Sequence, residues 1–490
     1  MKKNQGFKRL LNIFTLMFVV LSFVYILWLL IRVSNFKTFW VDELTSIWFS
    51  ESGISNVIKR MIVRSDPHPP GYQLLLAIVL DLGESKIQAI PRLLSVFSGL
   101  LTYLMGVLII YKSYSKEFFQ FFLLFTSFFW ITKDQIYYST EVRSYQISLF
   151  FLALLIYLDK FSNIQNKRIY LGVVSFLISF ISYIGTILVF SIFIVSVIES
   201  RLKFRVHLYL LIGPILTSMY YLYTLFKNPS TRKLQGFDPI FHLKDLFLNN
   251  IYKDTSFNFL ILSITFFGII FLISKHKNLA FSKVLNISNK TGLFYFLVTF
   301  IVVEFISIFY PIYQPRNFHF LKFIIPLFLL EMMYIIFKNS KLIFYLFFGI
   351  TLFLSQSLFF NISSEIMSDE MRKGENFYST LINEDVPLLL VNDDLATKSK
   401  IQSEYSNREV NNIFYLENIL YYDIKILEKD AVYKLNSSQL EKEYFEQIQI
   451  LGSHGADKQI NILEDYLIKN QYICKNKIEF GTNILKTCTR

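Results

Sequence analysis

Two adjacent acidic residues, Asp42 and Glu43, lie a few positions after the first long apolar segment of the chain ends. Charged side chains at the edge of a membrane-spanning segment are usually solvated, paired or functional, because an unpaired charge near hydrocarbon is costly. No Lys or Arg follows within the next helical turn to pair with them. A carboxylate in this place could take the proton from an incoming hydroxyl group. The structural alternative is that both acids cap an amphipathic helix from about Leu44 to Arg64.

A proline-rich segment follows and carries Asp66, His68 and Tyr72. Its three prolines and one glycine impose an extended, turning backbone, so His68 is held on a rigid element. A single histidine is most often a hydrogen-bonded structural residue. Beside Asp66 and within reach of Asp42, a functional role for His68 is favoured.

Two arginines, Arg143 and Arg316, stand at predicted boundaries of apolar segments, Arg143 just after Glu141 and Arg316 just after a proline. The guanidinium group is well shaped for bidentate capture of a phosphate. For Arg143 the alternative is that its side chain simply reaches out to the membrane interface. Together with the acids, these residues suit a membrane-borne phosphate ester whose head docks on the arginines while a carboxylate activates a hydroxyl.

Several other chemistries find no support in the sequence. The chain has no Walker motif, no GxGxxG and no HExxH, which disfavours soluble nucleotide use and zinc hydrolysis. Its only cysteines are Cys474 and Cys488, so a cluster of thiolates around a metal is excluded. The net charge is +12, and basic residues cluster in the predicted cytoplasmic loops. The positive charge therefore does not indicate a nucleic-acid-binding protein.

The elements that must position these residues are predominantly transmembrane helices. With 490 residues, 53% of them hydrophobic, and a mean hydropathy of +0.43, the chain is too apolar for a soluble globular protein. The sequence predicts an α-helical polytopic membrane protein with about eleven spans, within a range of about nine to thirteen. The first is a retained helix, because it is too long for a signal peptide and no small-residue cleavage site follows it. The predicted spans are 10–32, 91–111, 117–131, 144–159, 168–183, 185–199, 206–226, 257–274, 291–310, 319–337 and 341–360.

The basic residues predict the orientation of these spans. If the N-terminus is cytoplasmic, five alternate loops that carry basic clusters fall on the cytoplasmic side, as the positive-inside rule requires. These clusters are Lys112 and Lys116; Lys160, Lys167 and Arg168; Arg201, Lys203 and Arg205; Lys275, Lys277, Lys283 and Lys290; and Lys338 and Lys341. Segments 33–90, 132–143, 227–256 and 311–318 and everything after 361 are then extracytoplasmic. The apolar piece Tyr72–Leu82 is too short for a normal span and is predicted to be re-entrant or interfacial.

The composition changes after residue 360, which predicts two domains, 1–360 in the membrane with the outer loop 33–90, and 361–490 outside it. Charge rises, apolar runs shorten, and 386–391 resembles a buried strand entering a loop. Such alternating segments indicate a small extracytoplasmic α/β domain. Cys474 and Cys488 flank a predicted hairpin, and a disulfide between them would fit that location.

The order of these motifs resembles that of the bacterial members of the GT-C glycosyltransferase superfamily. One transmembrane helix is followed by Trp-x-Asp-Glu, then by His-Pro-Pro-x-Tyr, and then by Glu-x-Arg-x-Tyr near the third span. The pattern is most similar to that of the protein O-mannosyltransferases and the lipid A aminoarabinose transferases. The match at Arg316 is looser, since Asn317 stands where the family usually has Tyr.

The resemblance implies an inverting glycosyltransferase of the bacterial inner membrane. Such an enzyme transfers a sugar from a polyprenyl phosphate carrier to a hydroxyl acceptor, which can be a lipid, a glycan or a protein, at the outer face of the membrane. By position in the motifs, Asp42 corresponds to the general base and Glu43 to its companion. Asp66, His68 and Tyr72 correspond to the loop that shapes the pocket. Glu141, Arg143 and Tyr145 correspond to the donor site, together with Arg316.

The resemblance implies no required cofactor, although some superfamily members use a divalent metal. Asp42, His68 and Glu141 could together hold one. Two other classes of protein remain open. A glycolipid transporter or flippase is disfavoured because Glu304 and Glu331 are the main ionisable residues within the spans and no inverted repeat is evident. A non-catalytic glycan-assembly subunit would keep the fold without needing Asp42.

Overall fold

The computed structural model describes most of the helical region and the strands of a six-stranded sheet. It describes residues 2–36, 41–50, 53–64, 68–82, 89–130, 133–199, 204–227, 238–244, 255–275, 286–287, 290–309, 318–368, 388–390, 413–416, 433–435, 446–453, 457–469, 471–480 and 483–490. For some of these residues, Asp42 among them, it describes the backbone only.

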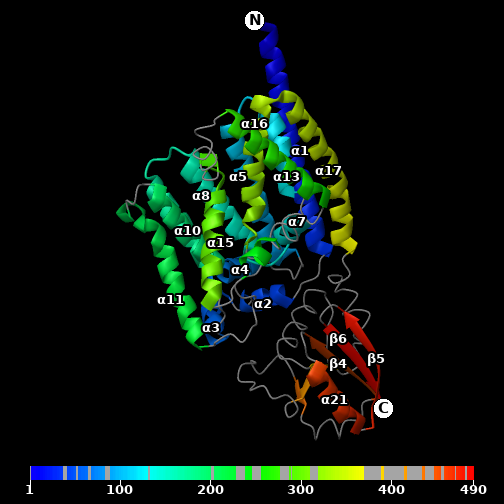
Figure 1. Ribbon diagram of the computed structural model, residues 1–490. Coiled ribbons are helices and arrows are strands. Elements are labelled where there is room, and N and C mark those ends of the chain that lie inside the picture. Colours follow the sequence, from blue (N-terminus) through cyan, green and yellow to red (C-terminus); the bar gives the residue numbers. More distant parts are fainter. Residues whose placement is uncertain are drawn as a thin grey trace.

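Each of the eleven predicted apolar segments forms a helix. These helices are α1 (Lys2–Phe36), α5 (Leu93–Ser113), α6 (Phe118–Trp130), α8 (Tyr145–Phe161), α9 (Lys167–Ile181), α10 (Tyr183–Glu199), α11 (Ile212–Lys227), α13 (Thr255–Lys275), α15 (Leu293–Phe309), α16 (Leu321–Asn339) and α17 (Lys341–Ser368). They pack into one bundle, with the N-terminus projecting from one end (Figure 1). A 3-10 helix, η2 (Phe204–Leu211), leads into α11.

Aromatic side chains fill the centre of the bundle. Tyr103 of α5 stacks on Phe125 of α6 with ring centroids 5.8 Å apart. This close approach needs Gly106, because a Cβ atom there would lie 2.1 Å from the Phe125 ring. Other large apolar side chains face outward, including Phe259, Leu342 and Phe353, which are each more than 70% exposed. An apolar core inside an apolar outer surface is typical of a helix bundle that has lipid as its solvent.

The lengths of the apolar helices vary. Within the described part of the chain, Met17–Asn35 and Ile90–Ser113 are long and apolar enough to cross a membrane by length and composition. Six further apolar helices are shorter, at 10–17 residues. Helix α4 (Gly71–Leu82) is one of them. Its 12 residues extend about 18 Å, well short of the roughly 30 Å of a hydrocarbon core.

Short helices gather at the end of the bundle nearest the C-terminal part of the chain (Figure 1). Here α2 (Val41–Ser50) and α3 (Ile54–Arg64) replace the single helix that the sequence suggested over 44–64. Gly53 separates them with a φ of 78°, a left-handed conformation that favours glycine. The same end holds α4 and, just before α8, α7 (Lys133–Ser139).

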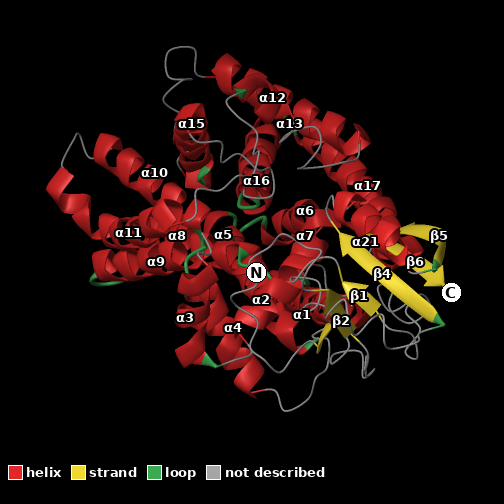
Figure 2. Ribbon diagram, turned by 90° about the horizontal axis from the view of Figure 1, so that it is seen from below, coloured by secondary structure: helices red, strands yellow, loops and turns green. Residues whose placement is uncertain are grey.

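The C-terminal part forms a six-stranded sheet with the order β3-β2-β1-β4-β6-β5. The strands β1 (Leu388–Leu390), β2 (Ile413–Leu416), β3 (Tyr433–Leu435) and β4 (Gln447–Ser453) run parallel. The hairpin of β5 (Ile473–Phe480) and β6 (Asn483–Thr489) adds antiparallel strands beside β4, and α21 (Asp457–Lys469) connects β4 to β5. The sheet lies at one side of the molecule (Figure 2). β1 confirms the central part of the strand predicted at 386–391, whose other residues lie outside the described ones.

A disulfide joins Cys474 and Cys488, which face each other across β5 and β6. The sequence placed both cysteines beside a hairpin, and the structure confirms that position. Closing this loop of 14 residues stabilises the hairpin by restricting the unfolded chain, on the order of 3 kcal/mol.

Candidate active site

A buried ion pair fixes the position of α2. The carboxylate of Glu43 accepts hydrogen bonds of 3.4 Å from both Nε and Nη2 of Arg92, and both side chains are fully buried. Arg92 ends the 3-10 helix η1 (Ile90–Arg92) that leads into α5. Its Nη1 donates at 2.7 Å to the carbonyl oxygen of Ser34, near the end of α1, where helical carbonyls lack intrahelical partners. One arginine therefore ties together α1, α2 and α5.

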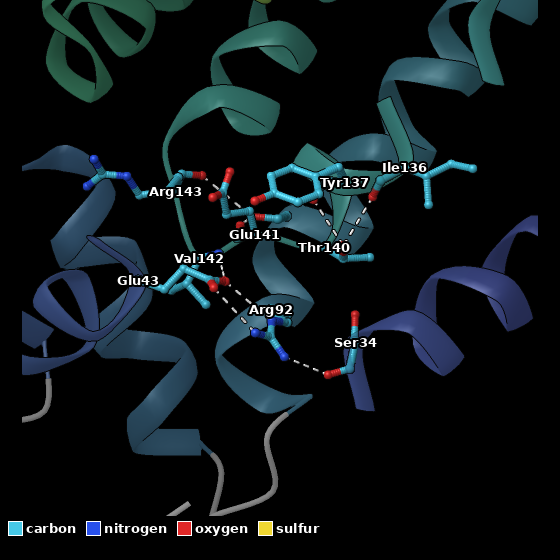
Figure 3. A network of polar contacts seen from close by, with 10 residues as sticks. Ser34, Glu43, Arg92, Ile136, Tyr137, Thr140, Glu141, Val142 and Arg143 are labelled. Atoms are coloured by element: carbon cyan, nitrogen blue, oxygen red, sulfur yellow. Dashed lines mark hydrogen bonds and ion pairs between the residues drawn. The ribbon is translucent and has the colours of Figure 1, made fainter. Parts of the chain in front are cut away.

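Glu43 also contacts the Glu-x-Arg-x-Tyr motif. Its Oε1 accepts a hydrogen bond of 2.8 Å from the backbone N–H of Val142, which lies 99 residues further along the chain (Figure 3). Val142 stands between Glu141 and Arg143 in the turn that links α7 to α8. The acidic motif on α2 and the Glu-x-Arg-x-Tyr motif thus meet at one point, as the sequence led us to expect.

The turn at 141–143 has a fixed shape. The N–H of Arg143 donates at 2.8 Å to the carbonyl oxygen of Glu141, and the Ser95 hydroxyl of α5 donates to the same carbonyl. Glu141 is buried, whereas Arg143 is half-buried. In Figure 3 the Arg143 side chain extends away from the Glu43–Arg92 pair. Arg92 is therefore enclosed within the protein, whereas Arg143 is partly accessible to solvent.

Tyr72 lies among the charged groups of the site. It is 2% exposed and packs with Ile47 of α2, Val142 and Ile147 in one apolar cluster. Burial raises the pKa of the Tyr72 phenol well above its ordinary value, while the nearby Ser95 hydroxyl and the charge of Arg143 act in the opposite direction. The phenol is therefore neutral at physiological pH and can serve as a hydrogen-bond donor or acceptor.

The proline-rich segment places His68 at the edge of this region. The His68 ring packs edge-on against Tyr183 of α10, with centroids 5.5 Å apart. Gly71 then begins α4, and a Cβ atom there would lie 2.4 Å from the carbonyl oxygen of Phe180. Ser50 of α2 donates to the carbonyl oxygen of Gln73 at 3.0 Å. Helix α4 is therefore tied to both α9 and α2.

Tyr145, the last residue of the Glu-x-Arg-x-Tyr motif, belongs to an aromatic group with Tyr138 and His319. The ring centroid of Tyr138 lies 5.1 Å from that of Tyr145 and 4.6 Å from that of His319. Nε2 of His319 is 3.1 Å from Oε1 of Gln146. Tyr145 and His319 line a cavity of about 30 Å³ between α8, α9, α10 and the start of α16, which has room for a single water.

Three of the predicted site residues cannot be placed by their side chains. Asp66 and Arg316 lie outside the described residues, and Asp42 is described by its backbone in α2 alone. Among the described side chains, no three from His, Cys, Asp and Glu come together as metal ligands. The metal site suggested for Asp42, His68 and Glu141 is therefore not tested, since it depends on Asp42.

Two residues of the site were not predicted from the sequence, Arg92 and His319. Arg92 stands at the start of an apolar segment, where a basic residue is ordinary. A charged residue directly after a proline at a predicted outer boundary is the one signal that could have drawn attention to it, because the same pattern occurs at Pro315-Arg316. His319 lies at the edge of an apolar run, and nothing in its neighbourhood distinguishes it.

These elements form a fold that is known from solved structures. The chain has the GT-C fold, which confirms at the level of fold the resemblance seen in the motifs. It is similar to ArnT from Cupriavidus metallidurans in two structures. For the apo state the TM-score is 0.56 with 9% identity, covering 96% of this chain and 97% of the other. For the form bound to undecaprenyl phosphate the TM-score is 0.53 with 10% identity, covering 96% and 98%. No family model and no curated protein matches the sequence.

Proposed function

We propose that this protein is an integral membrane glycosyltransferase. It transfers a sugar from a polyprenyl phosphate donor to a hydroxyl acceptor, which can be a lipid, a glycan or a protein, at the outer face of a bacterial inner membrane. The observation that carries the proposal is the meeting of α2 and the 141–143 turn on the carboxylate of Glu43. This contact brings the proposed base and the proposed phosphate-binding arginine to one end of a bundle whose fold is that of ArnT.

The eleven apolar helices that match the predicted spans are proposed to cross the membrane with the N-terminus in the cytoplasm. The end of the bundle that carries α2 and α4 then faces outward, and so does the C-terminal sheet (Figure 1). Helix α4 is placed at that outer interface, because it is short and because counting it as a span would invert every later loop. A lipid-linked donor can reach this end from within the outer leaflet, while an acceptor can approach from outside.

In this proposal Asp42 is the general base. Glu43 positions it, because the paired and fully buried Glu43 side chain fixes the backbone of the preceding residue. A sugar hydroxyl is a poor nucleophile at neutral pH, so a carboxylate near the proton speeds its attack on the anomeric carbon. Attack from the face opposite the departing phosphate inverts the configuration.

The other predicted residues are proposed to bind the donor and the acceptor. The half-buried guanidinium of Arg143 holds the departing phosphate, with Arg316 as a second contact and Tyr145 beside it. Glu141 orients the turn from which Arg143 extends. Asp66, His68 and Tyr72 shape the pocket. No metal is required, and Asp42, His68 and Glu141 are the residues that would hold one.

The proposal is tested with purified protein in vesicles that contain a polyprenyl phosphate sugar labelled in the sugar and an alcohol-bearing glycolipid acceptor. A glycosyltransferase releases polyprenyl phosphate and moves the label to the acceptor in equal amounts. A flippase moves the intact donor from one leaflet to the other without cleaving it, and that result would contradict the proposal. A non-catalytic subunit would do neither.

A further inference from the structure

A second cavity lies at the opposite end of the bundle from the proposed active site, between the ends of α8, α9, α10 and the 3-10 helix η2. Its volume is about 280 Å³, many times the space that one water needs and close to the size of small ligand pockets. This end also carries the N-terminus (Figure 1). In the proposed orientation the cavity opens at the level of the cytoplasmic leaflet.

The cavity has an apolar part and a polar part. Leu155, Leu171, Ile192 and Leu210 make an apolar part. The polar part is lined by side chains that can donate hydrogen bonds or carry charge: Asp159, Lys160, Ser196, His207 and Tyr209. A phospholipid is complementary to such a cavity, because its charged head group is joined to apolar acyl chains.

His207 supplies the strongest sign of a missing ligand. Both of its ring nitrogens are buried, and neither has a hydrogen-bond partner among the described residues. Its ring has an aromatic neighbour in Tyr209, with centroids 6.4 Å apart. A buried polar atom without a partner is costly, so a ligand in the cavity that pairs with these two nitrogens would be favoured.

The charge around the cavity identifies the kind of ligand. Lys160 and Lys167 both approach the carboxylate of Asp159, at 2.9 Å and 3.7 Å, and Arg168 is close enough for its charge to act on His207 and Tyr209. Two lysines thus flank one carboxylate, and a third cation lies near the His207 side of the cavity. The excess positive charge favours an anion.

We propose that this cavity binds the phosphate head of an anionic phospholipid of the cytoplasmic leaflet. The phosphate oxygens accept hydrogen bonds from His207 and Lys160, and the first carbons of an acyl chain lie against Leu155 and Leu171. Free inorganic phosphate shares the head chemistry but would leave the apolar walls unfilled. The inference uses the proposed membrane orientation and is independent of sugar transfer.

Native mass spectrometry of the full-length protein in detergent tests this site, with phosphatidylglycerol and phosphatidylcholine as probes. We expect wild-type protein to bind phosphatidylglycerol about tenfold more tightly than phosphatidylcholine, and Lys160→Gln or His207→Leu to remove most of that preference. Ser196→Leu, which fills the cavity without changing a charge, should weaken both. Lys112→Gln is the matched control, because Lys112 is exposed at the end of α5 and does not line the cavity.

The outcomes separate the alternatives. Equal affinity of wild-type protein for the two lipids would overturn the proposal, and so would a loss in Lys112→Gln as large as that in Lys160→Gln. Displacement of phosphatidylglycerol by millimolar inorganic phosphate would assign the site to soluble phosphate and contradict a lipid. None of these measurements involves the sugar donor, so their failure is distinct from failure of the proposed enzyme activity.

Discussion

Glu43 and Arg92 are the residues on which the arrangement of the site depends. Both are fully buried, and their contacts reach α1 and the 141–143 turn as well as each other. Removing one partner leaves the other as an uncompensated buried charge, whereas removing both does not. The pair therefore contributes to the position of α2 more than to the overall stability of the bundle.

We expect Arg92→Leu to lower the free energy of unfolding by about 3–5 kcal/mol, because Glu43 is left buried and unpaired. The double variant Arg92→Met/Glu43→Gln should recover much of this loss. Chemical unfolding in detergent provides the measurement. Arg32→Leu is the control, since Arg32 is exposed and stacks over Trp28, and should cost no more than about 1 kcal/mol. Equal losses in the single and double variants would contradict the pairing.

Arg143 is expected to act on the donor instead. Arg143→Ala should weaken binding of polyprenyl phosphate by about tenfold or more, through loss of a charge-assisted hydrogen bond. Arg143→Lys should recover only part of it, because a point charge replaces a bidentate fork. Binding of the lipid to the purified variants decides between this role and simple extension to the interface. Unchanged affinity in both variants would favour the interface.

Among the elements, α4 holds the outer end of the site together. It contacts α2 through Ser50 and approaches the end of α9 so closely that residue 71 has no space for a side chain. Tyr72 follows directly and enters the apolar cluster beneath the 141–143 turn. A displacement of α4 would therefore move Tyr72 relative to Glu43 and Arg143.

Gly71→Ala should destabilise the protein by about 1–3 kcal/mol, because its Cβ atom would contact the backbone oxygen of Phe180 and α4 would have to move. Gly349→Ala is the matched control. A Cβ atom at Gly349 meets nothing within 4 Å, and alanine favours a helix over glycine by up to about 1 kcal/mol. Thermal unfolding of both variants gives the comparison, and equal stability would show that α4 is not closely packed.

For the whole molecule, the proposed topology places the helical end with α2 and the C-terminal sheet on one side of the membrane. Single cysteines at the exposed residues Ser55 and Lys469 should react with a membrane-impermeant maleimide in intact spheroplasts. A cysteine at Lys116 should react only after the membrane is broken. Cys474 and Cys488 do not interfere because they form a disulfide. Reaction of Ser55→Cys and Lys469→Cys from opposite sides would contradict a shared outer face.

The sequence predicts the helices well because each is one continuous apolar run between polar residues, and it predicts β1 for the same reason. The sequence also predicts that the Asp42-Glu43 motif and the Glu-x-Arg-x-Tyr motif lie on the same side of the membrane, because the predicted order of the spans places both at its outer face. It does not predict what joins them. The partner of Glu43 is Arg92, 49 residues away, and only the tertiary packing of the helices brings the two together. The break of 44–64 into α2 and α3 was missed because Gly53 is a single residue within an otherwise helical pattern.

The role of Asp42 as the base of a sugar transfer is tested by the variant Asp42→Asn. Asparagine keeps the size and most hydrogen bonds of the side chain while removing its basicity. Loss of a positioned base typically slows a reaction by about 10²- to 10⁴-fold. We predict that Asp42→Asn enters the membrane and binds polyprenyl phosphate sugar as wild type does, yet transfers the sugar at least about a hundredfold more slowly, with Glu43→Gln less severe. Full transfer activity of Asp42→Asn, in membranes supplied with donor and acceptor, would contradict the assignment.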